Sequence, residues 1–300
     1  AKTDSLFQSA WTTAQRADAS VDAKASAARL IARDAARRVE VVTLLSGWLT
    51  PQTPGALQQS AIVALTRTGD ARAAELILAK WAGFSPESRI TVLETLTGRE
   101  VWVMELLSRV KAGQISPGAF DAGRRSQLQR HPSGKVKQLA AEVFQSSGAS
   151  SRTEVVNKFT PALALAVDAA KGRSTYIKLC VNCHKLDNQG NEVGPDLRSV
   201  IAHPSEKLLK NILDPSSDVQ PGFFAYSCTL KNGDEFYGLI TGEAGNGITM
   251  KLADGTLRQV LRGDIAELRG GALSLMPEGL EAGLTHQDVA DLIQFLRTPR

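Results

Sequence analysis

Five residues, Cys180-Val181-Asn182-Cys183-His184, place the strongest constraint on the fold of this 300-residue chain. Two cysteines separated by two residues can bring both sulfurs to the two vinyl groups of one porphyrin. The histidine that follows can then present an imidazole nitrogen to the iron. The spacing therefore predicts one covalently attached haem c, held by Cys180, Cys183 and His184, around which the chain must fold.

Three other roles are compatible with two cysteines at this spacing. A redox dithiol requires a βαβ setting, whereas residues 171–179 before the motif have a helical pattern. A structural zinc site requires four nitrogen or sulfur ligands, and the one further cysteine, Cys228, stands alone in the sequence. A structural disulfide is the third alternative.

A haem iron bound by His184 needs a ligand on its other face, and Met276 is the best candidate. It lies in a predicted loop before the last helix, and a His/Met pair is typical of electron-transfer cytochromes. A methionine that fills a gap in the core is the alternative. His203 would give a haem with two histidine ligands, although its place before a predicted helix favours a surface or capping role. Met104 and Met250 follow helical and strand patterns, respectively.

A second motif, Gly194-Pro195-Asp196-Leu197, begins eleven residues after Cys183. It resembles the Gly-Pro-Asn-Leu turn of class I cytochromes c. The resemblance implies that the carbonyl of Pro195 accepts a hydrogen bond from the imidazole of His184 and orients the ring. An ordinary Gly-Pro turn is the alternative.

The last predicted helix has a capping sequence in which Thr285 and Asp288 can bind the free backbone amides. Its apolar face is formed by Val289, Leu292, Ile293 and Leu296. In class I cytochromes such a helix crosses the first helix of the domain. We expect Gly172 and Tyr176 at this crossing, because small and aromatic residues allow close packing.

Residues 223–261 alternate between apolar and polar positions, which predicts four antiparallel strands in a meander. We place this insertion at about residues 220–263. Cys228 lies on the same strand face as Tyr226 and is expected to be buried and inert. Turns are expected at 231–234, 245–247 and 253–256.

Together the motifs are similar to the haem-binding C-terminal domain of planctomycete and verrucomicrobial type. The residues that carry the resemblance are the CxxCH motif, Gly194-Pro195, Asn211-Ile212-Leu213-Asp214-Pro215-Ser216, the β-rich stretch, Ser274-Leu275-Met276-Pro277-Glu278-Gly279-Leu280 and Asp291-Leu292-Ile293-Gln294-Phe295-Leu296. The resemblance covers about residues 152–300 and implies a class I-like cytochrome c domain with an inserted β meander. Members of this family commonly carry the domain after helical repeats.

Residues 1–150 are rich in Ala, Leu, Arg and Gln and have apolar residues at helical spacing. Prolines 54, 86 and 117 recur at intervals of 32 and 31 residues, with breaks expected near Gly69 and Gly98. This period indicates stacked helical hairpins like HEAT repeats, and a plain helical bundle is the alternative. We therefore predict a mainly α fold, with a HEAT-like α-solenoid at residues 1–150 and the cytochrome c domain at residues 151–300.

The charge of the chain is distributed unevenly. Residues 1–150 carry 19 Lys and Arg against 13 Asp and Glu, whereas residues 151–300 carry 16 against 18. Basic clusters such as 33–38 and 124–125 are compatible with an acidic protein partner, a membrane surface or simply a solvated helix face. Nucleic acid is not expected as a partner, because no basic strip interleaved with aromatic residues is present.

The longest purely apolar run, residues 162–167, is much too short to span a bilayer, so no transmembrane segment is expected. Residues 1–4 do not resemble a leader, and we expect any export signal to have been removed or to lie outside this sequence. Haem c is attached outside the bacterial cytoplasm. The motif therefore predicts a periplasmic protein.

These expectations combine into a monohaem electron-transfer protein, not an enzyme. We expect it to accept electrons from a partner or fused dehydrogenase and to pass them to a terminal acceptor. Arg198 and Tyr237 are candidate partners of the haem propionates. Two other function classes remain open: a haem enzyme or a gas or redox sensor in which Met276 is displaceable, and a helical-repeat scaffold in which the haem domain serves docking.

Overall fold

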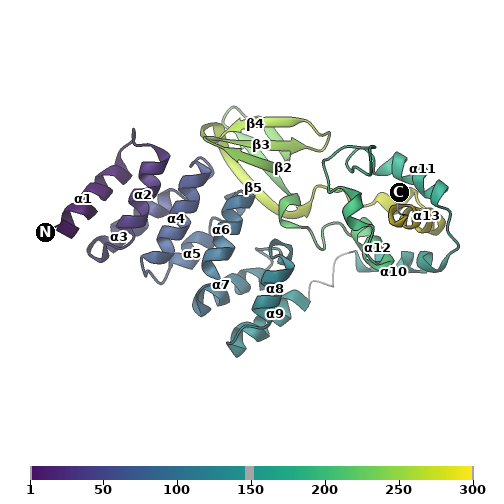
Figure 1. Cartoon of the computed structure of the whole chain (residues 1–300), viewed down its shortest axis with the longest axis horizontal. Coiled ribbons are helices and arrows are strands. Elements are labelled where there is room, and N and C mark those ends of the chain that lie inside the picture. The colour runs from purple at the N-terminus through teal and green to yellow at the C-terminus, as the bar shows by residue number, and fades with distance from the viewer. Residues whose placement is uncertain (1, 146–151, 299–300) are drawn as a thin grey trace.

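The computed structural model describes residues 2–145 and 152–298. The chain is mainly helical, as predicted, and has one antiparallel sheet. Figure 1 shows an elongated molecule in which a row of N-terminal helices, the sheet and a C-terminal group of helices follow one another. Within the described ranges, none of the helices is both long and apolar enough to cross a membrane.

The N-terminal helices form two layers. Helices α2, α4 and α6 lie side by side, and α3, α5 and α7 form the second row (Figure 1). Their bounds are α1 (Lys2–Gln15), α2 (Val21–Ile31), α3 (Arg38–Gly47), α4 (Gly55–Arg67), α5 (Ala73–Leu78), α6 (Pro86–Leu96), α7 (Glu100–Lys111), α8 (Ala122–Gln129) and α9 (Gly134–Gln145).

The recurring prolines mark the beginnings of helical units. Pro54 is the N-cap of α4, Pro86 is in the first turn of α6, and Pro117 opens the 3-10 turn that precedes α8. Proline suits these positions because its fixed φ matches a helix start and its missing N–H is not needed there. The predicted breaks also occur: Gly69, with a φ of 72°, separates α4 from α5, and Gly98 separates α6 from α7.

The sheet has the strand order β4-β3-β2-β1-β5, with every neighbouring pair antiparallel. The strands are β1 (Phe224–Leu230), β2 (Glu235–Ala244), β3 (Gly247–Leu252), β4 (Leu257–Leu261) and β5 (Ile265–Ser274). The predicted turns connect the first four strands, and Gly233 and Gly255 adopt the positive φ angles that such turns require. The four-stranded meander is thus confirmed.

The fifth strand was not predicted. Strand β5 pairs with the edge of β1 that does not pair with β2. In this pairing Tyr226 lies opposite Gly270. Two adjacent glycines, Gly270 and Gly271, weaken the strand pattern in the sequence. Gly270 is needed because a Cβ atom there would lie 2.0 Å from Nη2 of Arg89. The sheet therefore extends almost to Met276.

One face of the sheet packs against the N-terminal helices. Tyr226, Cys228 and Leu268 belong to the same buried cluster as helical residues such as Leu65 and Phe84. Cys228 is 1% exposed, so the prediction of a buried thiol is confirmed. Met250 is fully buried on β3, and Met104 packs against the helical part of the cluster, as their patterns indicated. The inserted meander and residues 2–145 thus share one hydrophobic core.

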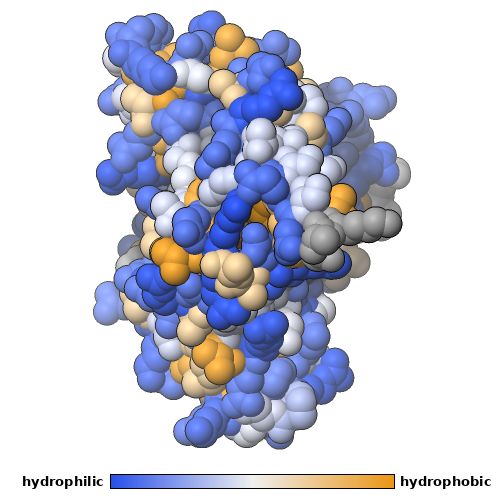
Figure 2. Space-filling model, turned by 90° about the vertical axis from the view of Figure 1, so that its left-hand side faces the viewer, coloured by the Kyte–Doolittle hydropathy of each residue, from blue (hydrophilic) through white to orange (hydrophobic). Residues whose placement is uncertain are grey.

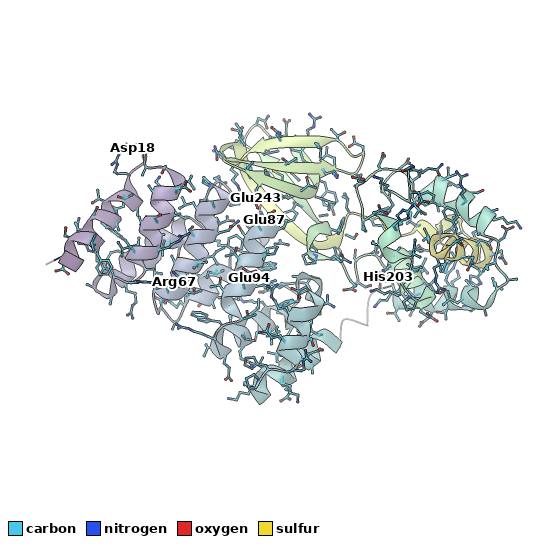
Figure 3. The ribbon with its side chains drawn as sticks, viewed as in Figure 1. Asp18, Arg67, Glu87, Glu94, His203 and Glu243 are labelled. Atoms are coloured by element: carbon cyan, nitrogen blue, oxygen red, sulfur yellow. The ribbon has the colours of Figure 1, made fainter. Side chains whose placement is uncertain are left out.

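A buried arginine fixes the sheet to the helices. The Arg262 side chain is 0% exposed and is paired with Glu243, while its Nη1 donates to the carbonyl of Pro51 at 2.7 Å. Glu87 of α6 lies next to Glu243 (Figure 3). The hydrogen bond with Glu243, together with burial, raises the pKa of Glu87 to about 7. Glu87 is therefore the more readily protonated of the two carboxyl groups beside the guanidinium group.

A second buried arginine, Arg89 of α6, makes a similar link. Its Nη2 donates to the carbonyl of Gly270 at 2.8 Å. The guanidinium carbon lies 4.9 Å from the centre of the Tyr226 ring, within the range of a cation–π contact. The hydroxyl of Tyr226 donates in turn to the carbonyl of Phe84 at 3.1 Å. These bonds hold β1 and β5 against the helices.

The C-terminal unit comprises α10 (Thr153–Phe159), α11 (Ala169–Leu179), α12 (Ser205–Leu213) and α13 (His286–Arg297). It has hydrophobic clusters of its own, separate from the cluster shared by the sheet and the N-terminal helices. Thr285 and Asp288 form the predicted capping box at the start of α13. The predicted domain boundary at residue 150 lies outside the described residues.

Helices α11 and α13 cross at the predicted residues. A Cβ atom on Gly172 would lie 1.9 Å from the carbonyl oxygen of Asp291, so only glycine allows this approach. One turn later the ring of Tyr176 lies 5.5 Å from that of Phe295, between ring centroids. The Asp291 carboxylate also accepts a hydrogen bond from the backbone of Asp168 at 2.7 Å. The crossing positions the end of α11, where the CxxCH motif begins.

Candidate functional site

The CxxCH motif folds as an extra turn at the end of α11. The N–H of Cys180 donates to the carbonyl of Tyr176 at 2.8 Å, and the N–H of His184 donates to the carbonyl of Cys180 at 2.8 Å. Cys180, Cys183 and His184 all line one cavity. Neither cysteine of the motif is in a disulfide. Both thiols are therefore free beside the same imidazole.

The imidazole of His184 is fixed by the loop that follows. Its Nδ1 lies 2.9 Å from the carbonyl oxygen of Pro195, the contact that the cytochrome resemblance implies. The N–H of Gly194 donates to the carbonyl of Cys183 at 2.7 Å, and this bond connects the loop to the CxxCH motif. When Nδ1 carries the proton for this bond, Nε2 has a free lone pair.

Tyr176 forms hydrogen bonds with the backbone of the same loop. Its hydroxyl donates to the carbonyl of His184 at 2.9 Å and lies 3.1 Å from that of Gln189. The side chain is 0% exposed, so these bonds form away from water. At Gly190 the φ angle is 97°, and a Cβ atom would lie 2.1 Å from the carbonyl oxygen of His184. The backbone around His184 is therefore held on several sides.

Burial sets the protonation of the motif. It lowers the pKa of His184, partly offset by the bond to Pro195, and so favours the neutral imidazole that binds metal. Burial, with the neighbouring Cys183, raises the pKa of Cys180 to about 11. Redox-active dithiols have lowered thiol pKa values. The environment of Cys180 thus argues against the redox-dithiol alternative.

The cavity has a volume of about 650 Å³, in the range of cofactor and small-molecule sites. Its walls come from α11, the 189–197 loop, α12, strand β2, the loop after β5, and α13. Most of the lining is apolar and includes Leu179, Val193, Leu197, Leu208, Ile212, Leu239, Leu275, Leu292 and Leu296. The two thiols and the imidazole thus open onto an apolar space suited to a large flat ring.

Met276 lines this cavity together with His184, although the whole sheet separates them in the sequence. It follows directly after β5, and its N–H donates to Oγ of Ser274 at 3.1 Å. The side chain is half-buried. The pairing of β5 with β1 is therefore what carries Met276 to the cavity.

His203, which the sequence analysis gave as a possible second histidine ligand, also lines the cavity. We expected a surface or capping role, but the side chain is half-buried at the wall. Within the described residues its Nδ1 is buried and has no hydrogen-bond partner. Burial, with the nearby charge of Lys207, lowers the pKa of His203. The flanking sequence favoured a surface role because it resembles an ordinary helix start.

The predicted propionate partners differ in their positions. Tyr237 lines the cavity with 51% of its surface exposed. Arg198 is not among the lining residues and pairs instead with Asp187. Lys207, which the sequence analysis did not single out, is at the wall. Tyr237 and Lys207 are thus two of the polar residues in the lining of the cavity.

The hairpin between β3 and β4 closes one edge of the site. Sγ of Cys183 lies 3.9 Å from the carbonyl oxygen of Ala253 in this turn. Nζ of Lys251 donates to the carbonyl of Glu192 at 2.7 Å. The sheet therefore contacts both the CxxCH motif and the loop that orients its histidine.

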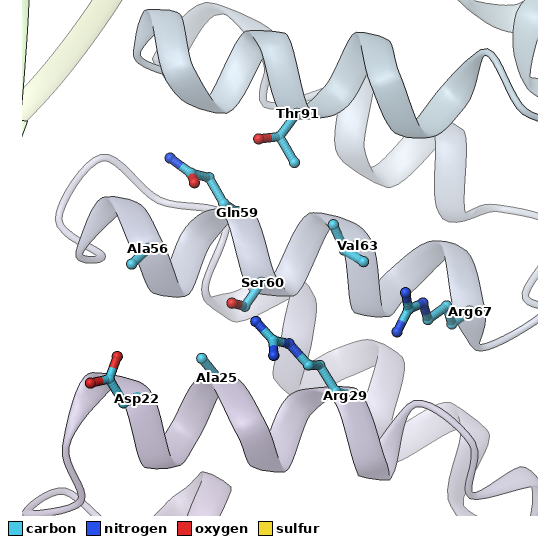
Figure 4. Close-up of a pocket in the computed structure, with 9 residues that line it drawn as sticks. All are labelled: Asp22, Ala25, Arg29, Ala56, Gln59, Ser60, Val63, Arg67 and Thr91. Carbon is cyan, nitrogen blue, oxygen red and sulfur yellow. The ribbon is translucent and has the colours of Figure 1, made fainter.

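A second cavity, of about 530 Å³, lies on the N-terminal helices (Figure 4). It is lined from α2, α4 and α6 by Asp22, Ala25, Arg29, Ala56, Gln59, Ser60, Val63, Arg67 and Thr91. Arg29 and Arg67 are both exposed. Figure 2 shows that the face at the N-terminal end of the molecule is mostly hydrophilic, with apolar residues scattered over it. This cavity has no thiol, imidazole or thioether in its lining.

In residues 2–145 and 152–298, no group of three or more His, Cys, Asp or Glu side chains is arranged to hold a metal ion. The zinc alternative thus gains no further ligand around Cys180 and Cys183. Comparison of the chain with protein-family models and with curated proteins gives no match.

Proposed function

We propose that this protein is a monohaem c-type cytochrome that transfers electrons in the periplasm. The observation that carries the proposal is one apolar cavity lined by two free thiols, an imidazole oriented by a backbone carbonyl, and a methionine from a distant segment. These are the groups that covalent haem attachment and His/Met ligation require.

The residues have distinct roles in this proposal. Cys180 and Cys183 would hold the haem through two thioether bonds, and His184 and Met276 would bind its iron. A bound haem c supplies a centre that gains and loses one electron. The Pro195 carbonyl holds the imidazole of His184 in one tautomer and orientation. The apolar walls exclude water, which influences the reduction potential.

The two layers of N-terminal helices support the interpretation as a HEAT-like solenoid. We propose that this half binds the redox partner, a dehydrogenase or a terminal acceptor. The support is the excess of basic residues in this half and the second cavity, which is lined in part by the exposed Arg29 and Arg67. Such a surface attracts acidic partners.

Expression with a haem c maturation system tests the proposal. The purified wild-type protein should keep its haem after denaturation, and a Cys180→Ala/Cys183→Ala double variant should not. Cys228→Ala is the matched control, because Cys228 is buried in the sheet and does not line the cavity. Voltammetry of the wild type should show a reversible one-electron couple. A wild-type protein without covalent haem, or haem retained by the double variant, would contradict the proposal.

A further inference from the structure

The loop that carries Met276 is bound by an arginine from a distant part of the C-terminal unit. This irregular segment follows β5 and leads into the 3-10 turn Leu280–Gly283. Arg152, which directly precedes α10, pairs with Glu281 of this turn. Its Nη1 also lies 3.8 Å from Oε2 of Glu278. One guanidinium group thus meets two carboxylates of the Met276 loop.

The same guanidinium group bonds to the end of α12. Its Nε donates to the carbonyl oxygen of Leu213, the last residue of that helix, at 2.5 Å. The last carbonyls of a helix lack partners within it and carry partial negative charge, so a cation is favourable there. Leu208 and Ile212 of α12 line the cavity, as does Met276. Arg152 therefore connects two segments of the cavity wall.

The pair between Arg152 and Glu281 is largely withdrawn from water. Each side chain is 15% exposed. Solvent and salt screen such a pair less than a surface pair. Removal of the cation would leave the Glu281 carboxylate mostly buried and without its charged partner, which is strongly destabilising. The turn must then move to hydrate the carboxylate, and Met276 is in the same loop.

We propose that Arg152 is a positioning residue that holds the Met276 loop against α12 and so keeps the thioether at the haem site. The proposal rests on the proposed function, because it takes Met276 as an iron ligand. Arg152 is not among the residues that line the cavity. It acts through Glu281 and the carbonyl of Leu213.

Competition of added imidazole with Met276 in the oxidised, haem-loaded full chain tests the proposal, with the near-infrared Met-to-iron band as the readout. In Arg152→Gln we expect the imidazole affinity to increase about tenfold or more, which corresponds to about 1.4 kcal/mol lost from the closed loop. Arg109→Gln is the matched control. Arg109 pairs with Glu105 within α7 and does not line the cavity, so this variant should keep the wild-type affinity.

The Arg152→Gln/Glu281→Gln double variant distinguishes positioning from a general loss of stability. It also removes the carboxylate that Arg152→Gln leaves unpaired, and the two neutral amides can bond to each other. The imidazole affinity should therefore return toward the wild-type value. A double variant with the same affinity as Arg152→Gln would overturn the role of the Arg152–Glu281 pair.

Hydrogen exchange of residues 275–284 gives a readout that does not require haem. Exchange should be faster in Arg152→Gln than in the wild type or in Arg109→Gln, with and without haem. Wild-type exchange or wild-type imidazole affinity in Arg152→Gln would overturn the proposal. A wild-type protein without covalent haem, or without the Met-to-iron band, would instead contradict the proposed function, so the two failures are distinguishable. Circular dichroism shows whether each variant is folded.

Discussion

Gly194 lies directly against the imidazole of His184. A Cβ atom on Gly194 would be 2.4 Å from Cε1 and 2.8 Å from Nδ1 of the ring. The ring is thus confined between the Gly194 backbone and the Pro195 carbonyl, to which Nδ1 is bonded. The position of the proposed iron ligand therefore depends on a residue that has no side chain, and its tautomer depends on the Pro195 carbonyl.

We predict that Gly194→Ala displaces His184 without preventing haem attachment, because the two cysteines are unaffected. The variant should show a larger high-spin fraction than the wild type and a rate of carbon monoxide binding increased by about tenfold or more, which corresponds to about 1.4 kcal/mol of lost ligation. Gly222→Ala is the control, since no atom lies within 4 Å of its added Cβ. Wild-type spectra for Gly194→Ala would show that the contact does not orient the ligand.

Gly172→Ala should destabilise the C-terminal unit. The added methyl group would collide with the backbone carbonyl of Asp291, so α11 and α13 must separate. Overpacking of this kind is destabilising by about 1–3 kcal/mol. Urea unfolding followed by circular dichroism measures the change. Gly47→Ala at the end of α3, where nothing lies within 4 Å, should have little effect. Equal stability of the two variants would rule out a tight crossing.

Arg262→Met should loosen the sheet from the helices. It removes the hydrogen bond to Pro51 and leaves Glu243 buried without its guanidinium partner. Breaking a buried ion pair by removing one partner is destabilising by about 3–5 kcal/mol. Arg269→Met is the control, because its pair with Glu267 is exposed and contributes about 0–1 kcal/mol. Urea unfolding measures the stability of the two variants, and limited proteolysis near β5 shows whether the sheet has separated from the helices. Similar losses in both variants would contradict a specific role of Arg262.

The pKa of Glu87 predicts a pH-dependent stability. Its value of about 7 in the folded protein is above its ordinary value of 4.5. The folded state therefore holds a proton that the unfolded state loses, and stability decreases as the pH rises from 4.5 through 7. Glu87 is exposed to solvent, which screens its interactions, so we expect a loss of at most about 1 kcal/mol.

Unfolding free energies measured from about pH 5 to about pH 8 test this dependence. In the Glu87→Gln variant the free energy of unfolding should depend less on pH. This variant should be more stable than the wild type at about pH 8. Glu235→Gln, an exposed glutamate at the start of β2, should keep the wild-type slope. If Glu87→Gln retains that slope, the proton is not held by the Glu87–Glu243 pair.

The local elements could be predicted because their signals are short in sequence. Proline at positions 54 and 86 fixes the backbone for a helix start, and glycine at positions 233 and 255 permits the turns of the meander. The crossing at Gly172 could be predicted because close helix approach excludes side chains. The fifth strand could not, since Gly270 and Gly271 have weak strand propensity and the reason for Gly270 is the distant Arg89 side chain that lies against it.

The sequence by itself determined the helical segments, the four strands of the meander and the candidate haem-binding residues Cys180, Cys183, His184 and Met276. Only the tertiary structure decided that the sheet shares its core with the N-terminal helices and that His203 is among the residues that line the cavity. Arg89 and Arg262 look like surface charges in the sequence, yet both are buried. The physical reason is that local propensity depends on neighbouring residues, whereas burial depends on which surfaces meet after the chain has folded.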